Sequence, residues 1–134
     1  MPSDLLATRQ RILAGEWTAS RAVDDAITRA QAPAGRDAFV LTRFDEARTD
    51  AARLDRETAR AARRPLAGLP FSVKDLFDVE GQVTAAGSTV LADHPPATAD
   101  CPAVARLRAA GGSLMGRTHM VEFAFSGMGT NPHV

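Results

Sequence analysis

Pro65-Leu-Ala-Gly-Leu-Pro-Phe-Ser-Val-Lys-Asp-Leu-Phe-Asp-Val-Glu-Gly81 is the most informative stretch of this chain. Its apolar run predicts a buried strand over residues 69–76, and Lys74 lies inside that run. Burying an ammonium group is costly unless the group is neutral, paired or catalytic. Lysine acts as a base near neutral pH only when burial or a neighbouring cation lowers its pKa. Position alone also allows a lysine at a strand end with its ammonium in water.

The length of 134 residues fits one domain, and the charge and cysteine content exclude some classes of function. Sixteen basic and sixteen acidic side chains cancel, so net charge does not favour nucleic acid or an anionic membrane as a partner. The single cysteine, Cys101, is typical of a reducing compartment. No apolar run approaches the ~20 residues that span a bilayer, and no secretory signal is recognised. We therefore expect a soluble cytoplasmic protein.

The first half, residues 1–64, is predicted to form a helical arm. Ser3 or Asp4 can cap a first helix, and Thr18 or Ser20 can cap a second. The apolar residues of the second helix follow the spacing of one buried face: Val23, Ala26, Ile27 and Ala30.

The rest of this half contains a short apolar segment and a longer helical one. Residues 38–42 predict a strand or a buried extended segment. Helical periodicity returns from Asp45 to Arg64, with ion pairs at helical spacing along its surface. Its apolar stripe is narrow and consists of small residues and one leucine: Ala47, Ala51, Leu54 and Ala61. This pattern favours a solvated outer helix over a binding surface.

The second half, residues 65–134, has shorter elements and more proline and glycine. After the first strand, Asp100 is placed to cap a helix that Gly111 ends, and residues 113–118 predict a further strand. A strand, a helix and a strand form the unit of an α/β domain with parallel pairing. The connection at 81–99 is long, and such loops are usually functional or covered by another segment.

Residues 111–118, Gly-Gly-Ser-Leu-Met-Gly-Arg-Thr, nearly match a phosphate-binding loop. Such a loop follows a strand and opens a helix, whereas these glycines follow a predicted helix and open a predicted strand. Arg117 also stands where the loop requires a lysine. We therefore favour a helix end followed by a strand.

The side chains that could bind a metal ion do not follow a zinc-binding spacing: His94, Cys101, His119, Glu122 and His133. Loop or surface histidines are the favoured interpretation. No metal and no other cofactor is predicted.

A series of motifs in the second half resembles the amidase signature family. They are Pro65 to Asp75, Thr84-Ala-Ala-Gly-Ser88, the Asp100 helix with its Ala-Ala-Gly-Gly end, Gly116-Arg-Thr-His-Met-Val-Glu-Phe-Ala124, and Gly129-Thr-Asn-Pro132. Each motif is weak alone, but their order and spacing together are specific over residues 65–134. The resemblance implies that this half is the start of a mixed-sheet α/β amidase core, truncated, behind a more variable helical arm.

The family cleaves carboxamides to an acid and ammonia or an amine with a Ser–cis-Ser–Lys triad. The resemblance implies that Lys74 is the lysine of that triad, a base that activates the nucleophilic serine through the bridging serine. In the family both serines and the oxyanion-hole amides lie in a Gly/Ser-rich stretch beyond the Asn-Pro motif, past Val134. We do not assign the nucleophile to the serines outside that stretch: Ser72, Ser88, Ser113 and Ser126.

The resemblance thus predicts the N-terminal part of an amidase that is inactive alone and whose partner is a small-molecule amide. One alternative is the A-type subunit of a glutamyl-tRNA amidotransferase, and another is a non-catalytic fragment or binding module. Exposed edges of an incomplete sheet predict self-association or a homo-oligomer, and no direct contact with nucleic acid or membrane is expected. His119 stands where the family often has asparagine, a difference that bears on the local loop and on substrate preference.

Overall fold

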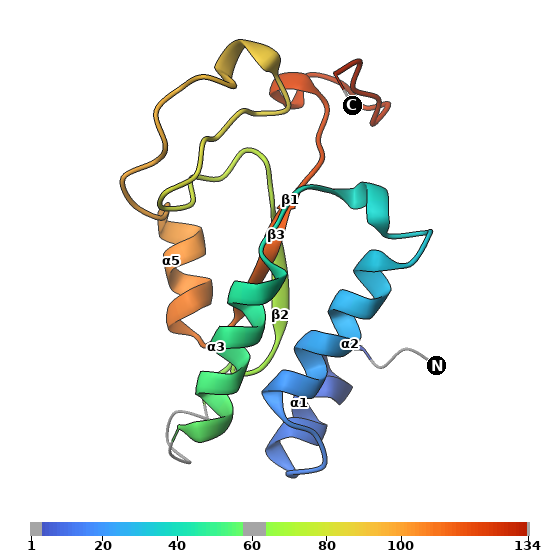
Figure 1. The fold of residues 1–134 in the computed structure, drawn as a ribbon, viewed down its shortest axis with the longest axis vertical. Helices are drawn as coiled ribbons and strands as arrows, with labels where there is room; N and C mark the ends of the chain where they lie inside the picture. Colours follow the sequence, from blue (N-terminus) through green and yellow to red (C-terminus); the bar gives the residue numbers. More distant parts are fainter. Residues whose placement is uncertain (1–3, 58–63, 134) are drawn as a thin grey trace.

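The computed structural model describes residues 4–57 and 64–133. In these residues a three-stranded sheet, in the order β1-β3-β2, lies between helices (Figure 1). Strand β1 (Phe39–Thr42) pairs antiparallel with β3 (Ser113–Thr118), and β2 (Pro70–Lys74) pairs parallel with β3. The parallel pair confirms the predicted α/β class, and β1 makes the sheet mixed.

The first two helices begin at caps that the sequence predicted. Asp4 Oδ1 accepts a hydrogen bond from the Ala7 N–H at 2.7 Å and caps α1 (Leu5–Leu13). Thr18, not Ser20, caps α2 (Ala19–Gln31) and accepts from the Arg21 N–H at 3.0 Å. A cap of this kind stabilises a helix by ~1 kcal/mol. The alternative cap Ser3 lies outside the described residues.

Helix α3 (Phe44–Arg56) ends earlier than predicted, because Glu57 takes up extended backbone with φ −73° and ψ 159°. The predicted continuation to Arg64 is therefore wrong at Glu57, and Ala61 lies outside the described residues. The predicted stripe of Ala47, Ala51 and Leu54 is buried. One side of α3 thus belongs to the core, and its charged side carries the expected ion pairs of Arg53 with Asp50 and Glu57.

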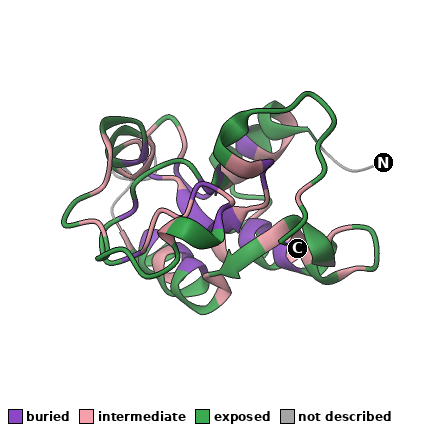
Figure 2. Ribbon diagram, turned by 90° about the horizontal axis from the view of Figure 1, so that it is seen from above, coloured by how far each residue is buried: buried purple, intermediate pink, exposed green. Residues whose placement is uncertain are grey.

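Two apolar clusters lie on opposite sides of β3. Met115 packs with buried residues of α2 and α3 and with Ala67: Ala19, Val23, Ile27, Ala47, Ala51 and Leu54. Leu114 packs with Val73, Val79 and Val104, the last from α5 (Pro102–Ala109). Neighbouring residues of a strand point to opposite faces, so β3 is covered on both sides, and buried residues gather at the centre of the molecule (Figure 2).

Gly116 lies where β1 and β3 approach most tightly. Its φ is +152°, and a Cβ atom there would lie 2.2 Å from the carbonyl oxygen of Leu41. Only glycine fits without displacing β1. The two glycines before β3 end α5 and lead into the strand, as predicted, with Gly111 at φ +94°.

The predicted cap of α5 is wrong. Cys101 is the N-cap residue and makes no side-chain hydrogen bond to the helix in the described residues. Asp100 Oδ1 instead accepts from the Glu80 N–H at 2.9 Å, and its Oδ2 lies 3.0 Å from Arg108 Nε. Asp100 therefore ties the segment after β2 to α5.

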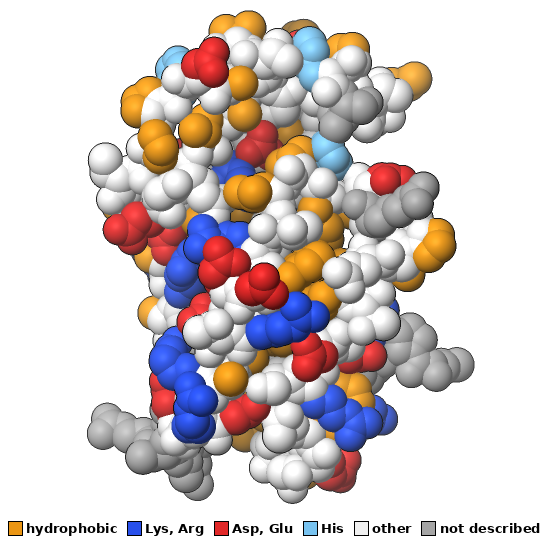
Figure 3. Space-filling view, viewed as in Figure 1, with side chains coloured by type: hydrophobic (Ala, Val, Ile, Leu, Met, Phe, Trp, Pro, Cys, Tyr) orange, Lys and Arg blue, Asp and Glu red, His pale blue; other side chains and the backbone are white. Residues whose placement is uncertain are grey.

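The connection at 81–99 crosses the end of the sheet (Figure 1) and is held by paired backbone hydrogen bonds between Gly81, Gln82 and Ala97. Short 3-10 helices complete the described elements: η1 (Arg36–Ala38), η2 (Thr89–Leu91) and η3 (Glu122–Ala124). On the face shown in Figure 3, charged side chains of both signs cover the helical half, and hydrophobic side chains gather over the loops at the other end. None of the helices in the described ranges is both long and apolar enough to cross a membrane.

Candidate active site

Lys74 is the last residue of β2, and its side chain is exposed. The predicted burial of this lysine is therefore wrong in this structure. Strand β2 lies at the edge of the described sheet, where Val73 packs against the α5 side. Because side chains alternate along a strand, Ser72 and Lys74 point to the opposite face, which is exposed. The alternative of a strand-end lysine in water describes the surroundings of Lys74.

Lys74 lines a cavity of about 690 Å³ at the carboxyl end of the parallel pair. The other walls come from the approach to β1, the residues after β3 and the C-terminal loop: Asp37, Phe39, His119, Met120, Val121, Ser126, Gly127, Gly129 and Asn131. A second cavity of about 470 Å³ shares His119 and Asn131 with the first. Sites for small ligands occupy roughly 300–1,000 Å³ and often lie at this end of parallel strands. The location and size therefore suit a small substrate.

A buried ion pair adjoins Lys74. Asp75 Oδ1 accepts from Arg117 Nε at 2.7 Å, and the two side chains are 6% and 2% exposed. Asp75 Oδ2 accepts from the Gly87 N–H at 3.0 Å. The Asp75 N–H donates to the Thr118 carbonyl at 3.1 Å, and its carbonyl accepts from the Ala86 N–H at 2.9 Å. Asp75 thus fastens the end of β2 to β3 and to the loop at 86–87.

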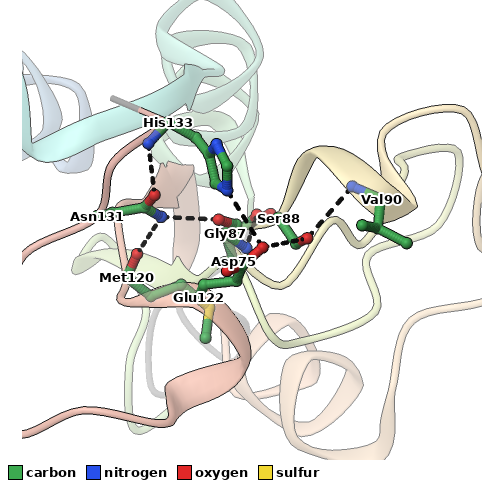
Figure 4. Close-up of polar contacts among 8 residues, drawn as sticks. All are labelled: Asp75, Gly87, Ser88, Val90, Met120, Glu122, Asn131 and His133. Carbon is green, nitrogen blue, oxygen red and sulfur yellow. Dashed lines mark hydrogen bonds and ion pairs between the residues drawn. The ribbon is translucent and has the colours of Figure 1, made fainter.

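Asn131 joins the C-terminal loop to the same region (Figure 4). Its Nδ2 donates to the carbonyls of Gly87 at 2.7 Å and Met120 at 2.8 Å. Its Oδ1 accepts from the His133 N–H at 2.9 Å. Both amide hydrogens and the oxygen of Asn131 therefore form hydrogen bonds with the backbone. The side chain of Asn131 thus connects the C-terminal loop to the segments at Gly87 and Met120.

Glu122 links two further segments (Figure 4). Its Oε1 accepts from Ser88 Oγ at 2.6 Å and lies 3.2 Å from His133 Nε2. The hydrogen bond from Ser88, followed by that of His133, holds the pKa of Glu122 below its ordinary value. A Ser–His–acid triad requires the imidazole between serine and carboxylate, whereas here the carboxylate lies between the other two. This geometry does not activate Ser88 as a nucleophile.

Of the five side chains considered as metal ligands, only Glu122 and His133 are in contact with each other in the described residues. Within residues 4–57 and 64–133, no three His, Cys, Asp or Glu side chains gather around a point that could hold a metal ion. His94 and Cys101 line a separate cavity beside Pro95 and Pro96, and His119 lies at the Lys74 cavity.

Sequence reasoning missed the partnership of Asp75 with Arg117 and the linking role of Asn131. A signal existed for the first, since Arg117 lies between Gly116 and Thr118 in a predicted strand of an α/β domain, and an arginine that such a domain buries needs a partner. The carboxylate that supplies it lies 42 residues away. Nothing local identified Asp75 as that carboxylate.

Comparison with known proteins gives a consistent result. A family model described as Amidase matches residues 21–134. The chain is 45% identical over 98 residues to AtzE, the 1-carboxybiuret hydrolase subunit of Pseudomonas sp. (strain ADP), covering 72% of this chain and 21% of that protein. It is 38% identical over 116 residues to the A-type subunit of the glutamyl-tRNA(Gln) amidotransferase of Anaeromyxobacter sp. (strain K), covering 85% and 23%. The chain thus spans less than a quarter of these two relatives.

Solved structures contain the same arrangement of helices and strands. The crystal structure of an amidase superposes with a TM-score of 0.84 at 39% identity, over 97% of this chain and 30% of that one. The peptide amidase from Stenotrophomonas maltophilia superposes with a TM-score of 0.78 at 29% identity, over 91% and 26%.

Proposed function

Because this chain belongs to the amidase family, we propose that it supplies the lysine base of an amide hydrolase that uses a Ser–cis-Ser–Lys triad. The observation that carries the proposal is the position of Lys74. It ends β2 beside its parallel partner and lines a cavity of about 690 Å³. The cavity offers space for a small carboxamide next to the Nζ atom.

In the proposed reaction, neutral Lys74 accepts the proton of a bridging serine as that serine takes the proton of the nucleophilic serine. The nucleophilic oxygen attacks the amide carbon, the nitrogen leaves with the returned proton, and water then hydrolyses the acyl-enzyme. The four serines considered above are not assigned to these roles. We propose that both catalytic serines belong to the part of the relatives that this chain does not span.

The exposure of Lys74 adds a requirement to this mechanism. A lysine surrounded by water keeps its proton near neutral pH, and burial is what lowers its pKa. The face of β2 that carries Ser72 and Lys74 is exposed. We propose that the segment bearing the serines covers this face, so that the same packing step assembles the triad and removes water from the lysine.

The test joins this chain to the C-terminal remainder of the amidase with 39% identity and measures ammonia release from simple amides. Lys74→Ala is expected to lower kcat by ~10³-fold or more, since triad members act as a unit. Arg106→Ala, exposed on α5 and outside the lining of the Lys74 cavity, is the control and should retain activity within about twofold. The chain alone should show no turnover. Hydrolysis by either protein that survives Lys74→Ala would contradict the proposal.

A second candidate, within the same family, is the A-type subunit of a glutamyl-tRNA amidotransferase. The observation that favours it is the 38% identity over 85% of this chain to such a protein. The amidotransferase passes ammonia to a charged tRNA within a complex. Co-purification of the full-length protein with partner subunits would support this function, whereas release of free ammonia without partners would support the hydrolase.

A further inference from the structure

His119 occupies the junction of the two cavities at the end of the sheet. Among the described residues, only His119 and Asn131 line both of them. Lys74 is paired in register with Thr118, so His119 follows the partner of the proposed base. The His119 N–H donates to the Ala38 carbonyl at 2.9 Å. This bond holds its backbone beside β1.

The imidazole of His119 has hydrogen-bonding capacity that the fold does not use. Its Nδ1 is buried without a partner in the described residues, and the residue as a whole is partly exposed. Asn131, by contrast, has its amide hydrogens and oxygen engaged by the backbone. An unpaired polar group of this kind costs free energy until a ligand or another segment supplies a partner.

The charged side chains around His119 other than Lys74 have partners within the fold, and Asp37 on the wall of the first cavity is one of them. Asp75 pairs with Arg117 on the wall of the second cavity. His133, on the same wall, pairs with Glu122. Lys74 is the proposed base. His119 is therefore the side chain at the junction that is best able to bind a polar group of a substrate.

We propose that His119 selects amides that carry a second carbonyl oxygen, which accepts a hydrogen bond from its imidazole while the scissile amide lies at Lys74. This inference rests on the proposed function and names its substrate class. An imidazole N–H donates to the oxygen of an amide or of a carboxylate. A purely apolar acyl chain would leave the imidazole unpaired, and a site built to hydrogen-bond its substrate discriminates against such analogues.

The test is a binding titration of the complete 134-residue chain, followed by NMR. Malonamide carries a neutral second carbonyl, malonamate carries a carboxylate, and isovaleramide has the shape of malonamide without the second carbonyl. Met120 lines the first cavity, so its methyl signal reports occupancy, while Met115, buried in the core, reports the fold. We expect malonamide or malonamate to shift the Met120 and His119 signals and to bind ~5–10-fold more tightly than isovaleramide, the value of one net hydrogen bond. His94, at a separate cavity, should not respond.

Variants identify the imidazole as the source of the preference. His119→Phe should abolish the preference for the dicarbonyl ligands, and His119→Asn, which keeps a donor, should retain part of it. His94→Phe is the matched control. A preference for malonamate over malonamide supports the inference only where His119→Phe removes it, because the Lys74 ammonium lines the same cavity and also attracts a carboxylate.

Three results would overturn the inference: equal binding of isovaleramide, an unchanged preference in His119→Phe with the Met115 signal intact, or no response of Met120 to any ligand. Hydrolysis plays no part in this readout. A negative titration therefore contradicts only the role of His119 and not that of Lys74. A negative activity assay contradicts the role of Lys74 and does not change what the titrations show about His119.

Discussion

Arg117 donates from Nε to Asp75 Oδ1 at 2.7 Å, between the two parallel strands and next to Lys74. With 2% and 6% of their side chains exposed, the two ions have given up most of their hydration. Such a pair is retained at a cost in desolvation. Here it holds the end of β2, the loop at 86–87 and β3 in one arrangement, and thereby fixes the backbone that carries Lys74.

Asp75→Asn should destabilise the chain by ~3–5 kcal/mol, because it leaves the Arg117 guanidinium buried without a counter-ion. Urea unfolding of the wild-type and variant chains measures this change in the free energy of unfolding. The matched control is Asp50→Asn, which breaks the exposed pair with Arg53 and should cost under ~1 kcal/mol. The double variant Asp75→Asn/Arg117→Met should cost less than the sum of the single changes. Equal costs for Asp75→Asn and Asp50→Asn would show that the buried pair is not a structural anchor.

Gly116→Ala should be strongly destabilising, by about 2–3 kcal/mol or more, because a methyl group would meet the Leu41 carbonyl in a left-handed backbone. Thermal unfolding compares it with Gly127→Ala. A Cβ atom added at Gly127 would have no atom of the described residues within 4 Å, so this control should change stability by less than ~0.5 kcal/mol. Equal melting temperatures of the two variants would mean that β1 moves away from the added methyl group at little cost in free energy.

The Glu122 contacts predict a pH dependence of the C-terminal loop. Since its folded pKa is lowered by Ser88 and then by His133, the stabilisation by the carboxylate is present above the unfolded pKa and is lost as the pH falls through the folded value. Glu122→Gln should remove this part of the acid sensitivity. The measurement is hydrogen exchange of the Ser88 and His133 segments from neutral to acid pH, and unchanged acid sensitivity in the variant would refute the assignment.

Exposed apolar side chains predict self-association of the chain. Phe125 is 92% exposed and Met128 is 82% exposed, both in the C-terminal loop, and β2 presents an open edge. Analytical ultracentrifugation should show an average molecular mass that rises with protein concentration. The double variant Phe125→Ser/Met128→Ser should lower this mass at each concentration. Leu6→Ser, exposed on α1, is the control and should have less effect. A monodisperse wild-type monomer would favour the self-contained binding module.

The sequence by itself determined the features that depend on neighbouring residues. The sequence limited each of the first two caps to two residues, of which Asp4 and Thr18 form the caps in the structure, and the periodicity of α2 predicted its buried face. The strand–helix–strand order predicted the parallel pairing of β2 with β3. The family motifs identified Lys74 as the candidate base, because their order and spacing are carried by the chain alone.

Only the tertiary structure decided which distant groups meet and which are covered. Asp100 accepts a hydrogen bond from the Glu80 N–H and forms an ion pair with Arg108 instead of capping α5, and Asp75 rather than another carboxylate neutralises Arg117. Lys74 lies in an apolar run but is exposed, because burial depends on what packs against an edge strand and not on the residues beside it. His119 became a candidate for substrate selection only when two cavities were found to meet at its side chain.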